Sequence, residues 1–157
     1  MCSGISLNQE TVNMGIKFRI NSILSVLFML FATTQVFAED HVINAEARRF
    51  APDIIYIQPG DNVGFTNMTS HNAVSIDSML PEGAEPFRGN LGQNLQLTLE
   101  VEGVYAYVCE PHLGFGMVGL IIVGEPTNLE AAREAAMQLQ GPYRRILGKL
   151  KKVEVSK

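Results

Sequence analysis

Short segments rich in β-branched and aromatic residues follow one another along the chain and are separated by turns that contain proline or glycine. Alternation of Leu95, Leu97 and Leu99 with polar residues predicts a strand with one buried face. Strands this short, at spacings of roughly 8–12 residues, indicate an all-β sandwich. The other strands are expected at 42–49, 54–57, 63–65, 73–76, 104–108 and 117–123.

Proline and glycine residues indicate where the turns and loops between the expected strands lie. Residues 50–53 are expected to form a turn, and 77–93 a loop. Pro59-Gly60-Asp61 predicts a type II turn, because proline fixes φ and glycine accepts a positive φ.

After residue 125 the pattern becomes helical. Thr127 and Glu130 fit a capping box, Gly141 ends the first helix, and Pro142 begins the second. The second helix has an apolar face, so both helices are expected to pack against a sheet. That face consists of Tyr143, Ile146, Leu147 and Leu150.

Basic residues cover the rest of the second helix and are interpreted as a solvated face; the alternative is a docking surface for an acidic partner or an anionic membrane. They are Arg144, Arg145, Lys149, Lys151 and Lys152.

The beginning of the chain has the pattern of a secretory signal. Lys17 and Arg19 precede an apolar run at 23–32, and Val36-Phe37-Ala38 predicts cleavage after Ala38. The run is shorter than the roughly 20 residues of a membrane span, so no stable membrane insertion is expected. Met14 is a hypothetical true start. The expected parts are a signal peptide (1–38), a β-sandwich (39–125) and a helical extension (126–157) of a periplasmic protein.

Removing residues 1–38 makes the chain more acidic. Lysine plus arginine falls from 12 to 10 and aspartate plus glutamate from 16 to 15, so the net charge becomes −5. This charge argues against nucleic acid as a partner. Cys109 is the one cysteine left after cleavage, which excludes an internal disulfide. A lone thiol in an oxidising compartment is expected to be reactive or bound to a metal.

The segment from Cys109 to Met117 brings a thiolate, an imidazole from His112 and a thioether within nine residues. This donor set suits copper in a trigonal electron-transfer site with a long axial bond. A second histidine is needed, and His71 lies at the junction of two expected strands. If the strands before His71 and Cys109 end at the same pole of the sandwich, their loops converge on one metal ion.

Other chemistries fit these residues less well. Structural zinc needs four strong ligands, and a c-type haem or a binuclear copper centre needs a second cysteine. A cysteine nucleophile needs a spatially separate base with an orienting partner. No open coordination position or acid–base pair can be identified, so no enzymatic activity is expected.

The residues from 40 to 152 resemble the pseudoazurins, a group of the cupredoxin family. The resemblance lies in the Cys109–Met117 loop, Pro59-Gly60-Asp61, Ser70-His71-Asn72, Met79–Phe87 and the two final helices. It implies a Greek-key sandwich of two sheets with one type 1 (blue) copper ion at one end. The implied ligands are His71, Cys109, His112 and Met117.

The resemblance also implies roles around the copper. Asn72 resembles a residue that braces the cysteine loop, and Pro111 lacks an N–H that could reach the sulfur. Pro111, Leu113 and Phe115 correspond to an apolar docking patch. Pseudoazurins surround that patch with lysines, whereas the four lysines after residue 38 all lie at 149 or later. This departure predicts weak salt dependence, or a partner that carries basic charge.

The sequence therefore predicts an exported, monomeric copper protein that carries electrons between a donor and an acceptor protein. A copper nitrite reductase, another periplasmic oxidoreductase or a cytochrome are the candidates. The alternative is a copper-binding or delivery protein that does not shuttle electrons. A separate hypothesis is that cleavage exposes Glu39-Asp40-His41 as a square-planar chelate for a second Cu(II) or Ni(II).

Overall fold

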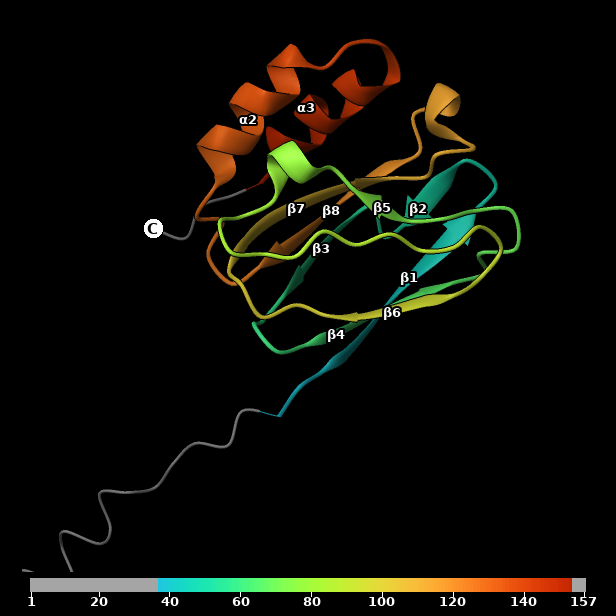
Figure 1. Cartoon of the computed structure of the whole chain (residues 1–157), viewed down its shortest axis with the longest axis horizontal. Helices are drawn as coiled ribbons and strands as arrows, with labels where there is room; N and C mark the ends of the chain where they lie inside the picture. Colours follow the sequence, from blue (N-terminus) through green and yellow to red (C-terminus); the bar gives the residue numbers. More distant parts are fainter. Residues whose placement is uncertain (1–36, 154–157) are drawn as a thin grey trace, which may run out of the picture. The chain divides into compact units, whose positions relative to one another are not determined.

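A computed structural model describes residues 37–153, and residues 38–153 contain two four-stranded sheets packed face to face (Figure 1). The predicted signal peptide and Met14 lie outside or at the edge of the described residues. No described helix has the length and apolar character needed to cross a membrane. One sheet has the order β2-β1-β4-β6, with β1 at Asp40–Glu46, β2 at Arg49–Ala51, β4 at Asn62–Thr66 and β6 at Leu95–Thr98. The other has the order β3-β8-β7-β5, with β3 at Ile54–Ile57, β8 at Val118–Val123, β7 at Gly103–Val108 and β5 at Val74–Ser75.

The predicted sandwich with two C-terminal helices is confirmed. Strand β1 pairs in parallel with β4, and β3 pairs in parallel with β8. The turn predicted at 50–53 is wrong for its first half, because Arg49–Ala51 forms β2 and pairs antiparallel with β1, and the predicted bend is confined to Pro52 and Asp53. The first strand ends at Glu46, and the chain also turns at Ala47 and Arg48. The side chain of Phe50 is only 1% exposed, and its burial in the core favours the strand. The predicted loop at 77–93 contains a 3₁₀ helix, η1, at Asp77–Met79.

The type II turn is confirmed. Gly60 has a φ of 89°, and the N–H of Asp61 donates to the carbonyl of Gln58 at 3.1 Å.

Two helices, α2 at Leu129–Gln138 and α3 at Arg144–Leu150, cover the outer face of the β3-β8-β7-β5 sheet (Figure 1). A 3₁₀ helix at Gly141–Tyr143, η3, joins them and contains Pro142. The apolar face of the second helix is confirmed, since Ile146 and Leu150 are both 0% exposed.

The predicted capping box is wrong. The Thr127 hydroxyl donates to the carbonyl of Glu102 at 2.9 Å, and the N-cap residue, Asn128, makes no side-chain bond to its own helix. The Asn128 carboxamide instead accepts from the N–H of Val104 at 2.7 Å. It also donates to the carbonyls of Val104 and Met79 at 3.1 and 3.2 Å. The start of α2 is therefore bonded to β7 and η1.

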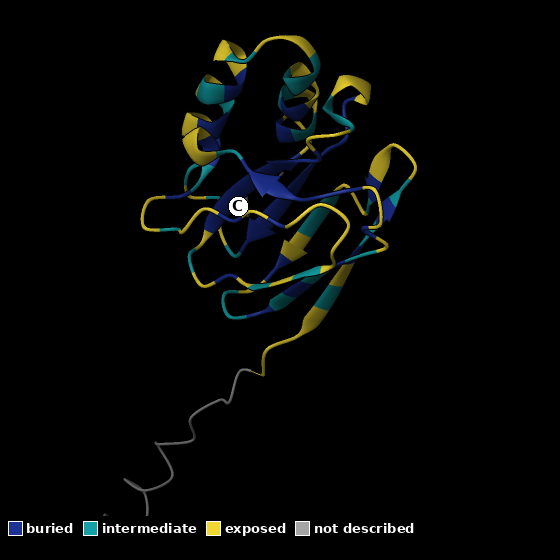
Figure 2. Cartoon of the chain, turned by 45° about the vertical axis from the view of Figure 1, so that its right-hand side comes forward, coloured by how far each residue is buried: buried dark blue, intermediate teal, exposed yellow. Residues whose placement is uncertain are grey.

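All residues of β7 and β8 are buried, because this sheet is covered on both faces (Figure 2). Side chains alternate between the faces of a strand. Val104, Ala106 and Val108 pack under the helices. Tyr105 and Tyr107 pack in the core between the sheets, and this inward series continues to Cys109.

Candidate metal centre

Cys109 and Met117 lie side by side at one end of the sandwich. Cys109 directly follows β7 and Met117 directly precedes β8, and these two strands are antiparallel neighbours. The N–H of Cys109 donates to the carbonyl of Met117 at 3.0 Å, which continues the pairing beyond the strands. Both side chains are 0% exposed and belong to the core between the sheets.

The loop between them folds into a tight 3₁₀ turn, η2, at Leu113–Phe115. The N–H of His112 donates to the carbonyl of Cys109 at 3.2 Å, which turns the chain back toward the sulfur. Gly116 closes the turn with a φ of 73°, a conformation that disfavours other residues. The spacing of two residues between the cysteine and His112 thus places both side chains on the same side of the loop.

His71 comes from the loop between β4 and β5. Its N–H donates to the carbonyl of Met68 at 2.8 Å, and its carbonyl accepts from the N–H of Gly92 at 3.0 Å. The residue is only 5% exposed. These backbone bonds hold the imidazole against the end of β7.

Three of the predicted ligands converge. The Sγ atom of Cys109 lies 3.6 Å from Nδ1 of His71 and 3.4 Å from Nδ1 of His112, and the three atoms lie within 4.8 Å of one another. Donor atoms bonded to one ion in a plane, at about 2.0–2.3 Å each, are separated by roughly 3.5–3.8 Å. The spacing and the soft thiolate therefore fit a copper ion. His41 does not belong to this group; its ring contacts Asp61.

The environment of the site affects protonation in two ways. Burial, and secondarily the nearby His112, hold the pKa of His71 below its usual value, which favours the neutral imidazole that binds metals. Burial raises the pKa of the Cys109 thiol, while the backbone N–H groups of Asn72 and His112 oppose this effect. The same N–H groups are suitable donors to a metal-bound thiolate.

Asn72 connects the two ligand loops. Its Oδ1 accepts from the N–H of Glu110 at 2.9 Å, and its Nδ2 donates to Oε2 of Glu110 at 2.7 Å. The same carboxylate oxygen accepts from Nη1 of Arg88 at 2.7 Å. Glu110 and Arg88 are not among the site residues predicted from the sequence. The available signal was the acidic residue directly after the cysteine.

The outer side of the loop carries part of the predicted apolar patch. Pro111 is exposed and Phe115 is 48% exposed, whereas Leu113 is half-buried against the core under the helices.

Beside this patch lies a surface with an excess of basic residues that we call the basic flank. Its cations are Arg48, Arg49, Arg145, Lys149 and Lys152, and the carboxylates of Glu46 and Asp53 line the same surface. Cζ of Arg48 lies 4.4 Å from the centre of the Phe115 ring, a cation–π contact. Arg145 packs against Gly116, and Lys149 pairs with Asp53. The expectation of an absent basic rim considered lysines alone. Two arginines, Arg48 and Arg145, lie beside the patch. Arg145 is exposed, as a solvated face predicts, whereas the side chain of Lys149 is only 15% exposed and pairs with Asp53.

Comparisons with known proteins agree with this fold and site. Residues 38–124 match the family of copper-binding proteins described as the plastocyanin/azurin family. Pseudoazurin of Paracoccus pantotrophus is 40% identical over 112 residues, which cover 68% of this chain and 75% of that protein.

Two solved structures are also similar. The pseudoazurin of Hyphomicrobium denitrificans, at 31% identity, aligns over 73% of this chain and 98% of its own with a TM-score of 0.64. That of Methylobacterium extorquens, at 28% identity, aligns over 74% of this chain and 100% of its own with a TM-score of 0.65.

The fold and the donor set define a cupredoxin, and the chain belongs to the plastocyanin/azurin family of copper-binding proteins. Members of this family hold a type 1 copper ion and carry electrons, and they are not enzymes. Within the family, the chain groups with the pseudoazurins.

Proposed function

We propose that this protein is an exported electron carrier that passes single electrons from a donor to an acceptor protein by Cu(I)/Cu(II) cycling. The observation that supports it is the convergence of Cys109 Sγ with the two Nδ1 atoms within 4.8 Å. The residues that would hold the ion are His71 and His112 through imidazole nitrogens, Cys109 through its thiolate and Met117 through its thioether. A bound copper ion supplies the redox couple and the thiolate charge-transfer colour.

The protein's own residues keep the donor geometry fixed. His71 is 5% exposed and Cys109 and Met117 are 0% exposed, so little water reaches the site. Backbone hydrogen bonds of His71 with Met68 and Gly92 fix the first ligand loop, and the bond from the His112 N–H to the Cys109 carbonyl fixes the second. A donor set that moves little between oxidation states lowers the barrier to electron transfer.

The partner is proposed to dock at the apolar patch beside His112. Pro111 and Phe115 form its exposed part, with Leu113 beneath. The basic flank adjoins this patch, so an acidic face on the donor or acceptor is favoured. A copper nitrite reductase, another periplasmic oxidoreductase or a cytochrome with such a face remains a candidate.

Charge reversal tests this part of the proposal. Arg145→Glu is expected to slow electron transfer to an acidic partner and to flatten its dependence on ionic strength. Lys151→Glu is the matched control, since Lys151 is exposed and does not line the basic flank. Equal effects of the two substitutions on the rate and on its salt dependence contradict a local docking role.

We further propose that residues 1–38 are a signal peptide, cleaved after Ala38, and that residues 39–125 and 126–157 form the sandwich and its helical extension in a periplasmic monomer. The length of the secreted chain, measured by intact mass, tests the cleavage. Gel filtration tests the monomeric state.

The metal site is tested by adding one equivalent of Cu(II) to the secreted protein and recording visible absorption and electron paramagnetic resonance. An intense colour that a mild reductant bleaches reversibly is expected. Cys109→Ser is expected to abolish the colour, and Met117→Leu to shift the reduction potential. Met137→Leu is the control, because Met137 is 62% exposed on α2. A pale or irreversibly reduced complex contradicts the proposal and favours copper delivery.

A further inference from the structure

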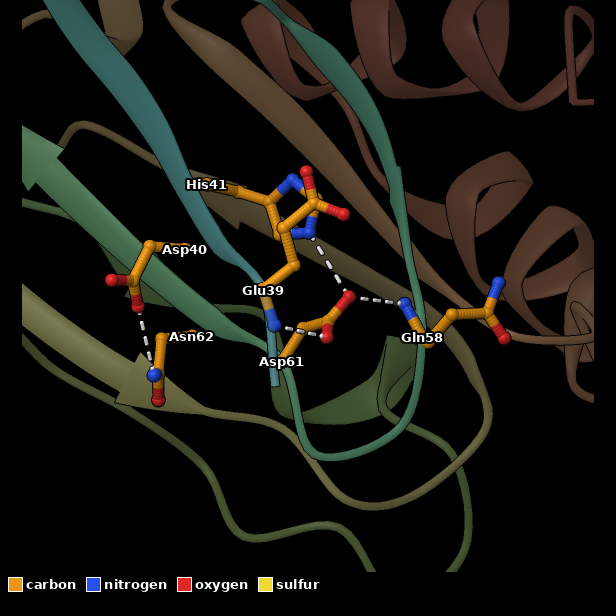
Figure 3. Close-up of polar contacts among 6 residues, drawn as sticks. All are labelled: Glu39, Asp40, His41, Gln58, Asp61 and Asn62. Carbon is orange, nitrogen blue, oxygen red and sulfur yellow. Dashed lines mark hydrogen bonds and ion pairs between the residues drawn. The ribbon is translucent and has the colours of Figure 1, made fainter. Parts of the chain in front are cut away.

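A second cluster of titratable groups lies where β1 begins, around the buried side chain of Asp61. Asp61 is 4% exposed and ends the Pro59-Gly60 turn. Its Oδ1 accepts from the backbone N–H of Glu39 at 2.8 Å (Figure 3). Its Oδ2 accepts from the backbone N–H of Gln58 at 2.8 Å and from Nε2–H of His41 at 3.0 Å. The carboxylate therefore joins the first strand to the turn before β4.

The Asp61 carboxylate accepts three hydrogen bonds, but no permanently charged cation pairs with it among the described residues. The N–H groups of Glu39 and Gln58, followed by His41, hold the pKa of Asp61 below its usual value. Among the described residues, the only ion-pair partner of Asp61 is His41, and a histidine is charged only when protonated. A buried carboxylate is stabilised further when a permanent cation lies beside it.

We propose that Asp61 is the binding site for the α-ammonium group that cleavage after Ala38 creates on Glu39. The inference rests on the cleavage part of the proposed function and is independent of the copper site. Hydrolysis of the Ala38–Glu39 peptide bond takes up one water, releases the carboxylate of Ala38 and leaves the Glu39 nitrogen as an amine that is protonated at neutral pH. The nitrogen already lies 2.8 Å from Oδ1, so an amide hydrogen bond becomes a charge-assisted ion pair without movement.

The same contacts disfavour the square-planar chelate hypothesised for Glu39-Asp40-His41. That chelate requires the amine, the amide nitrogens and the His41 ring to wrap around one ion. In the structure, the Glu39 nitrogen and the His41 ring both face Asp61 (Figure 3). The Glu39 carbonyl accepts from the N–H of Asn62 at 2.9 Å, and Asp40 pairs with Asn62 in the parallel ladder. Chelation would break these bonds.

The experiment compares two copper-loaded proteins, one beginning at Glu39 and one with a Gly-Ser-Gly extension before Glu39. The extension keeps the Glu39 N–H and moves the positive charge away. The Glu39 form is expected to have a Tm higher by roughly 4–8 °C, as a charge-assisted bond of ordinary strength would give. Asp61→Asn in both proteins is expected to remove the difference.

The difference should also depend on pH. An α-ammonium, with an ordinary pKa of about 7.7–8.0, gains a higher pKa beside a carboxylate. Its contribution to stability is then fully present below the ordinary pKa and is lost as pH rises through the raised one. The other titratable groups facing the cluster are the Glu39 side chain, His41 and Glu100, which lies over Gly60. They are identical in the two proteins, so the difference isolates the α-amine.

Four results would overturn the proposal, of which the first three concern stability and the position of cleavage. These three are equal Tm values for the two proteins, a difference that persists in Asp61→Asn, and a secreted chain whose intact mass shows an end other than Glu39. Binding of a second equivalent of Ni(II) by the Glu39 form, with loss of the Tm difference, would support the chelate and also overturn it. The visible spectrum tests the copper site independently of these measurements. Failure of the proposed electron-carrier function can therefore be distinguished from failure of the proposed α-ammonium site.

Discussion

Removing the amide that joins the two ligand loops is the perturbation with the most direct structural basis. Asn72→Ala deletes two hydrogen bonds to Glu110, of 2.9 and 2.7 Å, and Asn72 is only 5% exposed. A neutral hydrogen bond contributes about 0.5–1.5 kcal/mol and one to a charged group about 1.5–3 kcal/mol. Because the Glu110 side chain is 45% exposed and water can replace its lost donor, the lower half of the second range applies. The free energy of unfolding is expected to fall by about 2–4 kcal/mol, the sum of the two contributions.

The assay is urea unfolding of the metal-free and copper-loaded proteins, combined with the visible spectrum and the reduction potential. The spectrum and potential are expected to change as well, because Asn72 holds the loop of Cys109 against that of His71. Asn90→Ala is the matched control, since the exposed Asn90 amide bonds only to Gln93, at 3.2 Å, among the described side chains. An unfolding free energy within about 0.5 kcal/mol of the parent, with an unchanged spectrum, would refute the bridging role of Asn72.

The remaining predictions concern the buried polar groups that support the sandwich. Tyr107→Phe is expected to leave stability unchanged or raise it by about 1 kcal/mol, because the buried Tyr107 hydroxyl has no hydrogen-bond partner among residues 37–153. Tyr105→Phe is expected to lower stability by about 1 kcal/mol, since the Tyr105 hydroxyl donates to the carbonyl of Val101 at 2.8 Å. Urea unfolding compares the two variants. A larger loss of stability in Tyr107→Phe than in Tyr105→Phe would contradict the reasoning. Asn128→Ala is expected to cost about 2–4 kcal/mol, because the buried N–H and carbonyl of Val104 lose their partner. Thr127→Ala, which removes one exposed bond, should cost less than about 1 kcal/mol in the same assay.

Much of the fold could be predicted because it depends on local pattern. The alternation of Leu95 and Leu97 predicted a strand, β6, that is intermediate on one face and exposed on the other. The Gly60 turn follows from the φ that only glycine adopts readily. Phe50 could not be placed in the same way, because a proline two residues later suggested a turn. Its burial against Phe65 and Tyr107, with ring centres at 5.9 and 4.8 Å, is a contact between distant parts of the chain.

The site shows the same division between local and long-range information. Cys109, His112 and Met117 lie in one loop with a recognisable spacing, and His71 lies at the junction of two expected strands. Glu110 and Arg88 could not be assigned, because their roles depend on Asn72, a residue 38 positions before Glu110 in the chain. Thr127, and not Asn128, was predicted as the N-cap of the first helix for a comparable reason. The hydrogen-bond partners of Asn128 are in β7 and η1, and no sequence pattern within the helix indicates them.

Charged residues lie near both ends of the β7–β8 pair. β7 enters the site at Val108 and β8 leaves it at Val118, so their other ends, Gly103 and Val123, mark the opposite pole. Glu102 and Glu125 lie beside that pole, while Arg48 and Arg145 contact the ligand loop.

A net charge of −5 after cleavage would by itself repel an acidic partner. At physiological ionic strength, however, charges more than about 8 Å away are largely screened. A partner that docks at the apolar patch, as proposed, would therefore experience mainly the nearby charges, which are those of the basic flank and of Glu46 and Asp53 on the same surface. In the proposed docking orientation, the basic flank faces an acidic surface of the partner, which would bring the partner's redox centre close to His112.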